Sequence, residues 1–261
     1  MRRIGLTAET LPGIIADHPE LNISLPDYPI EPTMRAAIYF TPPDDAELTR
    51  AAAVWLGRDA FTGGPTREPD PDLDPRVAAP ARYGFHATVK APFRLAEGCT
   101  LADLTQHMAV FCAARQSFRI DRVAIDRLGA FFAFVAAPQP TALNALEEAV
   151  VREFDVVRAP ASRDEIARRQ PERLSRRQRQ NLEKWGYPYV MDEFRFHMTL
   201  TGPIAEADQE VMETTLKNRF ARFDGVSLPV DRLALFVEPE PGAPFVVHSV
   251  HPFAPPAESL S

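Results

Sequence analysis

The chain has 261 residues and a formal net charge of −7 at pH 7, so it can bury a proper core, and its acidic balance argues against binding duplex DNA. No apolar run approaches the roughly 20 residues of a membrane span, and no apolar stretch follows the first three residues as a secretory signal would require. The two cysteines, Cys99 and Cys112, are wrongly spaced for a zinc knuckle or a redox pair and fit thiols in a reducing compartment. We therefore expect a cytoplasmic protein without a membrane partner, and we expect any anionic ligand to be small.

Residues 1–33 differ from the rest of the chain because they hold five prolines and show no sustained apolar period. Two interpretations stay open: an N-terminal extension that packs on the body as an arm, or an over-long start with Met34 as the true first residue. Residues 34–253 are expected to form one two-lobed domain, and 254–261 a C-terminal tail.

From Met34 onward the pattern alternates between strands and helices. A strand is predicted over 35–41, a helix over 44–56 with Asp44 or Asp45 as N-cap, a loop over 62–82 rich in Gly, Pro and Asp, and a strand over 83–94. The later predicted elements are a helix at 101–115, strands at 117–126 and 129–137, a helix at 141–154, a charged helical segment at 163–184, a strand at 194–201, a helix at 206–222, and strands near 228–237 and 244–250.

A weak internal repeat runs through this order. Each copy has a Phe-His-x-Thr strand, a helix, an Asp-Arg-Leu segment and an apolar run, and the distance from His to Asp is 40 residues in one copy (86 to 126) and 34 in the other (197 to 231). The repeat predicts an α+β fold of two similar lobes, each a small, mostly antiparallel sheet with helices. The active cleft is expected between the lobes, with one His-x-Thr strand from each.

The two His-x-Thr strands carry the chemistry. Side chains alternate between the faces of a strand, so His86 shares a face with Thr88, and His197 with Thr199. A hydroxyl can donate to a phosphate oxygen while the neighbouring imidazole moves a proton. One such motif arises often by chance and is usually a structural histidine, but two copies that each follow a Phe on a strand pattern are much rarer. The pair predicts a phosphate-handling site.

These segments resemble a known family. Phe-His-Ala-Thr-Val at 85–89 and Phe-His-Met-Thr-Leu at 196–200 are similar to the paired signature of the 2H phosphoesterase superfamily. Longer strings at 83–93, 185–189 and 194–202 resemble a bacterial branch that is often encoded beside phosphonate-utilisation operons. The resemblance covers roughly 34–253 and implies a two-lobed α+β body. It also implies that His86 and His197 are the catalytic pair and that Thr88 and Thr199 bind the phosphate.

Further candidates lie near the two motifs. Lys90 lies two residues past Thr88, and Arg195 two residues before His197, so each is expected on the polar face of its strand, where it could meet a phosphate. An exposed basic side chain is the competing interpretation. Tyr39 could line the cleft or pack at its rim. Tyr187 and Tyr189 could stack a base or a sugar, or pack at the lobe interface.

Two other features allow less specific conclusions. Residues 163–184 hold eight Arg or Lys against four acids and form either a basic lid over an anionic substrate or a solvated helix face. His248 and His251 would face opposite sides of a strand and lack further ligands, so we expect no metal site there.

The leading hypothesis is a phosphodiesterase that opens the cyclic phosphate of a nucleotide or sugar by His/His acid-base catalysis, without metal or cofactor. The alternatives are an enzyme of RNA ends, acting on 2′,3′-cyclic or 2′,5′-linked termini, and a non-catalytic binder of phosphorylated ligands. The sequence leaves open the exact substrate, the oligomeric state, and which histidine is the base.

Overall fold

The computed structural model describes residues 34–255. The expectations for the extension at 1–33 and for the tail beyond residue 255 lie outside the described residues. Within them, no helix combines the length and the apolarity that a membrane span requires.

The main sheet has seven strands in the order β4-β5-β6-β2-β1-β8-β9, and all neighbours are antiparallel. One residue pair, Ala87 with Met198, joins β2 to β6 and thereby connects two half-sheets. A separate two-stranded sheet pairs β3 with β7. The strands are β1 (Arg35–Phe40), β2 (Ala87–Phe93), β3 (Phe118–Ile120), β4 (Val123–Leu128), β5 (Phe131–Ala136), β6 (His197–Thr199), β7 (Leu228–Val230), β8 (Arg232–Glu238) and β9 (Val246–Pro252).

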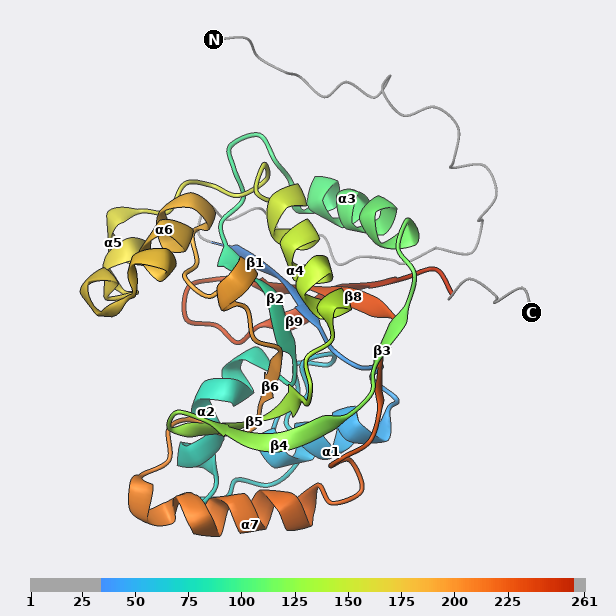
Figure 1. Cartoon of the computed structure of the whole chain (residues 1–261), viewed down its shortest axis with the longest axis vertical. Coiled ribbons are helices and arrows are strands. Elements are labelled where there is room, and N and C mark those ends of the chain that lie inside the picture. Colours follow the sequence, from blue (N-terminus) through green and yellow to red (C-terminus); the bar gives the residue numbers. More distant parts are fainter. Residues whose placement is uncertain (1–33, 256–261) are drawn as a thin grey trace.

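The α-helices are α1 (Glu47–Leu56), α2 (Asp74–Tyr83), α3 (Leu101–Ala113), α4 (Thr141–Glu153), α5 (Arg163–Ala167), α6 (Arg176–Trp185) and α7 (Gln209–Arg219). In Figure 1, α3 and α4 lie with β1, β2, β8 and β9 in the upper half of the molecule, whereas α1, α2 and α7 lie with β4 and β5 in the lower half. The predicted two-lobed α+β fold is confirmed.

The lobes do not coincide with the two sequence copies. The strand β2 of the first copy lies in the half-sheet of β8 and β9, which come from the second copy, and α3 packs on β8 and β9. In the same way β6 of the second copy pairs with β5 of the first, and α7 packs on β4. Each lobe therefore contains parts of both copies, which an assignment from sequence order alone could not reveal.

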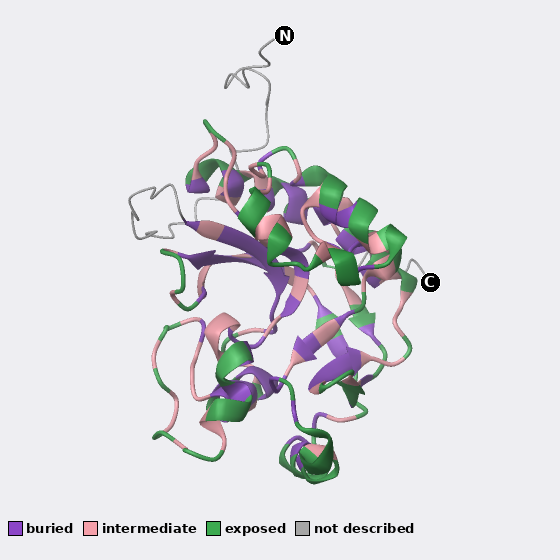
Figure 2. Cartoon of the chain, turned by 90° about the vertical axis from the view of Figure 1, so that its left-hand side faces the viewer, coloured by how far each residue is buried: buried purple, intermediate pink, exposed green. Residues whose placement is uncertain are grey.

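The main core lies between one face of the sheet and the helices that cover it. The predicted apolar stripe of α3 is buried there, and a capping box between Thr100 and Asp103 fixes the start of that helix. Figure 2 shows the burial concentrated on the strands, with the exposed residues mostly on the outer faces of helices and on loops. The four motif side chains lie on the opposite face of the sheet and are half-buried.

The predictions for the start of the first helix and for the loop at 62–82 were wrong. The first helix begins at Glu47, and its N-cap is Ala46 without a side-chain cap, so neither Asp44 nor Asp45 caps it. The predicted loop at 62–82 contains most of helix α2, which tolerates its proline near the start because the first N–H groups of a helix have no partner.

The second proline of α2 also has a compensating contact. Pro80 has no N–H to give to the carbonyl of Arg76, and that carbonyl instead accepts from the backbone N–H of Gly202 at 2.7 Å. A contact with a distant segment therefore satisfies the group that the proline leaves open, and it ties α2 to the chain just after β6.

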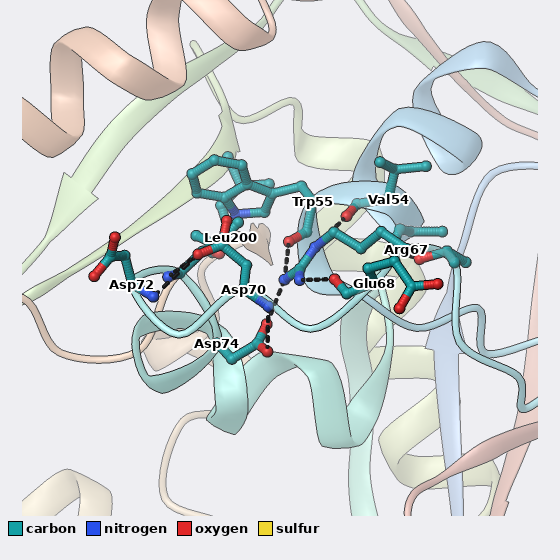
Figure 3. A network of polar contacts seen from close by, with 11 residues as sticks. Val54, Trp55, Arg67, Glu68, Asp70, Asp72, Asp74 and Leu200 are labelled. Atoms are coloured by element: carbon teal, nitrogen blue, oxygen red, sulfur yellow. Dashed lines mark hydrogen bonds and ion pairs between the residues drawn. The ribbon is translucent and has the colours of Figure 1, made fainter.

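A polar network holds α2 against α1 (Figure 3). The Arg67 guanidinium pairs with Asp74 at 2.6 Å and donates to the Val54 carbonyl at 3.0 Å, while Asp74 accepts from the backbone N–H of Asp70 at 2.9 Å. Beside it the Trp55 indole donates to the Leu200 carbonyl at 2.8 Å, directly after β6. The network thus positions the helix that leads into β2 as well as the chain that leaves β6.

Candidate active site

The four motif side chains lie on one face of the sheet at the junction of the two half-sheets. Ala87 pairs with Met198, and both belong to the core on the other face. Because antiparallel strands place the preceding residue of one beside the following residue of the other, His86 lies next to Thr199 and His197 next to Thr88. Each imidazole therefore has one threonine of its own strand and one of the neighbouring strand beside it. We call these four side chains the histidine patch.

The imidazole of His86 is held from several sides. Its Nδ1 lies 3.0 Å from the Gly84 carbonyl, its Nε2 lies 3.2 Å from the Thr88 hydroxyl, and its ring stacks on Tyr39 with centroids 3.8 Å apart. Gly84 has φ +75°, and a Cβ there would lie 2.4 Å from the Cβ of Ala60. Only glycine therefore permits this close approach, which sets the carbonyl that orients His86.

His197 repeats the backbone contact of His86. Its Nδ1 lies 2.7 Å from the carbonyl of Arg195. In both cases the carbonyl belongs to the residue two positions before the histidine. A carbonyl can only accept, so in both rings Nδ1 carries the proton and Nε2 keeps its lone pair when the ring is neutral. Both imidazoles are thus prepared to take a proton at Nε2.

Burial keeps both imidazoles neutral near pH 7. It lowers the pKa of His86 to about 4, with the nearby charge of His197 acting in the same direction and the hydrogen bond to the Gly84 carbonyl opposing it. Burial also lowers the pKa of His197, and the charge of Arg195 lowers it further. In both rings the loss of solvent is the largest cause of the shift.

Two threonines that the sequence did not single out support the strands. Buried Thr41 donates from its hydroxyl to the Phe85 carbonyl at 2.9 Å, just before His86. Buried Thr201 accepts from the backbone N–H of Phe132 at 3.0 Å, just after Thr199. In the sequence Thr201 directly follows the second motif strand, whereas Thr41 only ends the first predicted strand, so nothing in the sequence connects it with His86.

The tyrosine candidates take different places. Tyr39 is buried, 1% exposed, and forms the floor under His86. Tyr187 is half-buried, and burial raises its pKa, whereas Tyr189 is 48% exposed and meets Tyr187 edge to face at 5.6 Å. Burial raises the pKa of Tyr39. The ring centroid of Tyr83 lies 6.2 Å from that of His86, so Tyr83 borders the same imidazole on which Tyr39 stacks.

Lys90 does not share the face of Thr88, and that expectation was wrong. Tyr39 pairs with Thr88 but Ile38 pairs with Lys90, so an extra residue in β2 interrupts the alternation. Lys90 is 4% exposed, donates to the Val151 carbonyl at 3.3 Å and lies 3.5 Å from Asp155. Burial lowers the pKa of this lysine to about 8.

Arg195 contributes through its backbone. Its side chain is exposed, and the guanidinium lies 3.7 Å from the Asp126 carboxylate on β4. Its carbonyl orients His197 as described above. No contact in the described part of the chain directs the guanidinium toward the motif hydroxyls.

A cavity of about 730 Å³ lies beside the histidine patch. Tyr83 and six arginines are among its lining residues, and α5 with the residues after it supplies part of one wall. Within the segment 163–184, residues of α5 and the two arginines after it line the cavity, whereas the charged residues of α6 are exposed and do not line it. Whether the segment acts as a lid stays a prediction. The sequence indicated the charge of this segment but not the cavity.

Among residues 34–255, no three or more His, Cys, Asp or Glu side chains gather as a metal site would require. The buried His251 of the pair at 248 and 251 bonds through Nε2 to the Ser249 hydroxyl at 2.8 Å.

Most of this chain resembles known proteins. Residues 88–246 match a family model described as a protein of unknown function, DUF1045. A protein of Janthinobacterium sp. (strain Marseille) named ribose 1,5-bisphosphate phosphokinase PhnN is 38% identical over 241 residues, 88% of this chain and 53% of that protein. A protein of the same name from Laribacter hongkongensis (strain HLHK9) is 37% identical over 219 residues, 81% of this chain and 50% of that protein.

The chain spans about half the length of these curated relatives. Among solved structures, TT0787 of Thermus thermophilus is a distant likeness, with 15% identity, a TM-score of 0.42 and coverage of 84% of this chain and 97% of that one.

Proposed function

This chain belongs to the DUF1045 family of proteins of unknown function, and we propose that it is a metal-independent phosphoesterase that opens a cyclic phosphate ester at His86 and His197. One observation carries the proposal: two imidazole–hydroxyl pairs from distant segments lie side by side on one face of adjacent antiparallel strands. The resemblance of both segments to the 2H phosphoesterase signature supports the same reaction.

The proposed reaction assigns one proton transfer to each histidine. His86 is neutral, and its Nε2 takes a proton from a water whose oxygen attacks phosphorus. The bond from phosphorus to one ring ester oxygen breaks, and protonated His197 gives its proton to that leaving oxygen. Products are a phosphate monoester and a free hydroxyl, so atoms and protons balance.

The hydroxyls of Thr88 and Thr199 stabilise the charge on the two non-bridging oxygens. In the structure Thr88 contacts Nε2 of His86 at 3.2 Å, so its hydroxyl exchanges that contact for a phosphate oxygen when substrate binds. The anionic phosphate in turn favours the protonated form of His197, which the acid step needs.

The kinase name of the relatives concerns proteins about twice as long as the matched segment. The 261 residues contain no Gly-Lys dipeptide and hence no P-loop of the Gly-Lys-Ser/Thr type. We assign the phosphokinase activity of those proteins to their other half. The ribose 1,5-bisphosphate in the name of those proteins supports a sugar phosphate rather than RNA as the substrate here, as does the net charge of −7. The resemblance to the branch beside phosphonate-utilisation operons supports a role in phosphonate metabolism.

A panel of substrates tests the proposal. It compares ribose cyclic phosphates, nucleoside 2′,3′-cyclic phosphates and short RNAs with cyclic 2′,3′ ends, each with and without chelator. We expect chelator-insensitive ring opening of the sugar or nucleotide esters, and a fall in kcat of at least about a hundredfold in His86→Ala and in His197→Ala.

The matched control is His107→Ala, because His107 is a partly exposed surface histidine paired with Glu153 at 2.8 Å, away from the patch. It should retain wild-type turnover. Near wild-type rates in either motif variant, or activity that chelator abolishes, would contradict the proposal.

A further inference from the structure

The cavity beside the histidines is strongly basic. Its six arginines come from five separate segments of the chain, and two carboxylates, Asp164 and Glu165, also line it. The arginines are Arg35, Arg82, Arg94, Arg158, Arg168 and Arg169. In Figure 1 the α5–α6 segment that forms one wall lies at the left edge, beside β1 and β2.

Nearby carboxylates hold four of these arginines in place. Arg35 and Arg82 both bond to the buried carboxylate of Glu238, so one negative charge serves two guanidinium groups. Arg94 pairs with Glu165 through two nitrogens at 3.1 and 3.2 Å, and this pairing lowers the pKa of Glu165 to about 2.

Arg158 in turn pairs with Asp155 at 2.8 Å. Asp155 also lies 3.5 Å from buried Lys90, so this carboxylate too serves two cations. The lining therefore keeps a positive excess.

Arg168 and Arg169 are different. Within residues 34–255 neither guanidinium has a carboxylate or hydrogen-bond partner, and Arg169 lies over the ring of Tyr187 at 4.8 Å. Guanidinium groups present a planar set of donors that matches a phosphate, and unpaired ones lose no existing ion pair when a phosphate binds. These two side chains are the available anion ligands of the cavity.

The cavity and the histidine patch adjoin each other. Tyr83 lines the cavity, and its ring centroid is 6.2 Å from that of His86. Tyr83 therefore borders both the cavity and the histidine patch.

We infer that the cavity binds a second, non-reacting phosphate of the substrate, through Arg168 and Arg169. The inference rests on the proposed function and narrows it. The substrate class is a small sugar ester with a cyclic phosphate at the histidines and a phosphate monoester at the far end. The second phosphate supplies binding energy and orientation to the ring that opens.

Binding of ribose 5-phosphate, which has the monoester but no ring to open, tests the cavity apart from the reaction. Calorimetry compares the wild type with Arg168→Gln/Arg169→Gln, with His86→Ala/His197→Ala, and with the control Arg173→Gln/Arg179→Gln, whose exposed arginines do not line the cavity. Ribose without phosphate serves as the ligand control.

We expect ribose 5-phosphate to bind the wild type, the histidine variant and the control equally, and the Arg168→Gln/Arg169→Gln variant at least about tenfold more weakly. Thermal melting checks that each variant is folded. Equal binding by that variant, loss of binding only in the histidine variant, or no binding to wild type would overturn the inference. Failure of ring opening with intact arginine-dependent binding would instead refute the proposed reaction alone.

Discussion

The imidazole of His86 lies nearly flat on the phenol ring of Tyr39, with centroids 3.8 Å apart and an angle of 20° between the planes. Tyr39 is itself packed against Phe236, at 4.9 Å between centroids, and is fully enclosed. The catalytic candidate therefore rests on a rigid aromatic floor that belongs to the core.

This stacking predicts a difference between two substitutions of Tyr39. Tyr39→Phe keeps the aromatic surface and should leave kcat close to wild type. Tyr39→Leu removes the stack and should lower kcat by about tenfold, because a loosened ring spends less time in the reactive geometry. Rates for both variants on the same cyclic ester, with folding checked by circular dichroism, provide the measurement. A larger loss in the Phe variant would show that the hydroxyl, not the stack, matters.

The depressed histidine pKa values predict an acidic optimum for kcat/KM. This parameter reports the free enzyme, where the base His86 with a pKa of about 4 is neutral above that pH. The acid His197 must be protonated, and burial holds its pKa below 6.5. The fraction of enzyme with a protonated His197 therefore falls as the pH rises through that pKa. We expect a maximum between about pH 4 and 6.5.

Bound phosphate raises both histidine pKa values, so the profile of kcat should lie at higher pH than that of kcat/KM. Rate measurements from about pH 4 to 9 at low and at saturating substrate separate the two profiles. A kcat/KM that keeps rising to about pH 8 would be incompatible with the roles assigned to the histidines.

Gly84 is predicted to be intolerant of a side chain. Gly84→Ala places a Cβ 2.4 Å from that of Ala60 and forces an L-residue to φ +75°, a strain of about 1–3 kcal/mol before the clash is counted. Because the Gly84 carbonyl orients His86, kcat should fall together with the melting temperature.

Two further variants separate the clash from the strain. Adding Ala60→Gly to Gly84→Ala removes the clash and should recover part of both losses. Gly98→Ala is the matched control, since Gly98 has φ +82° with no atom within 4 Å of the added Cβ. If Gly98→Ala and Gly84→Ala behave alike, close approach to Ala60 is not what requires glycine.

Lys90 is predicted to affect stability rather than phosphate binding. Lys90→Met removes the bond to the Val151 carbonyl and one partner of Asp155, which keeps Arg158, so we expect a loss of about 1–3 kcal/mol in the free energy of unfolding. The KM for the cyclic ester should not change. Urea unfolding measures the stability, and steady-state kinetics on the same preparation measure KM. A raised KM with unchanged stability would show that Lys90 binds the substrate.

The sequence by itself determined most of the strands, most of the helices and the face on which the two His-x-Thr motifs lie. Alternation of faces is a local property, so the burial of Phe85 and Phe196 and the half-exposed position of His86 and His197 could be predicted from neighbouring residues alone.

The tertiary structure decided how these pieces meet. The pairing of Ala87 with Met198, the exchange of parts between the two copies and the extra residue that turns Lys90 away all depend on hydrogen bonds between distant strands. Helix α2 depends likewise on Gly202, which satisfies a carbonyl that Pro80 cannot. These contacts depend on which distant segments become neighbours in space. The arginine cavity, whose lining comes from separate segments, results from the same long-range packing.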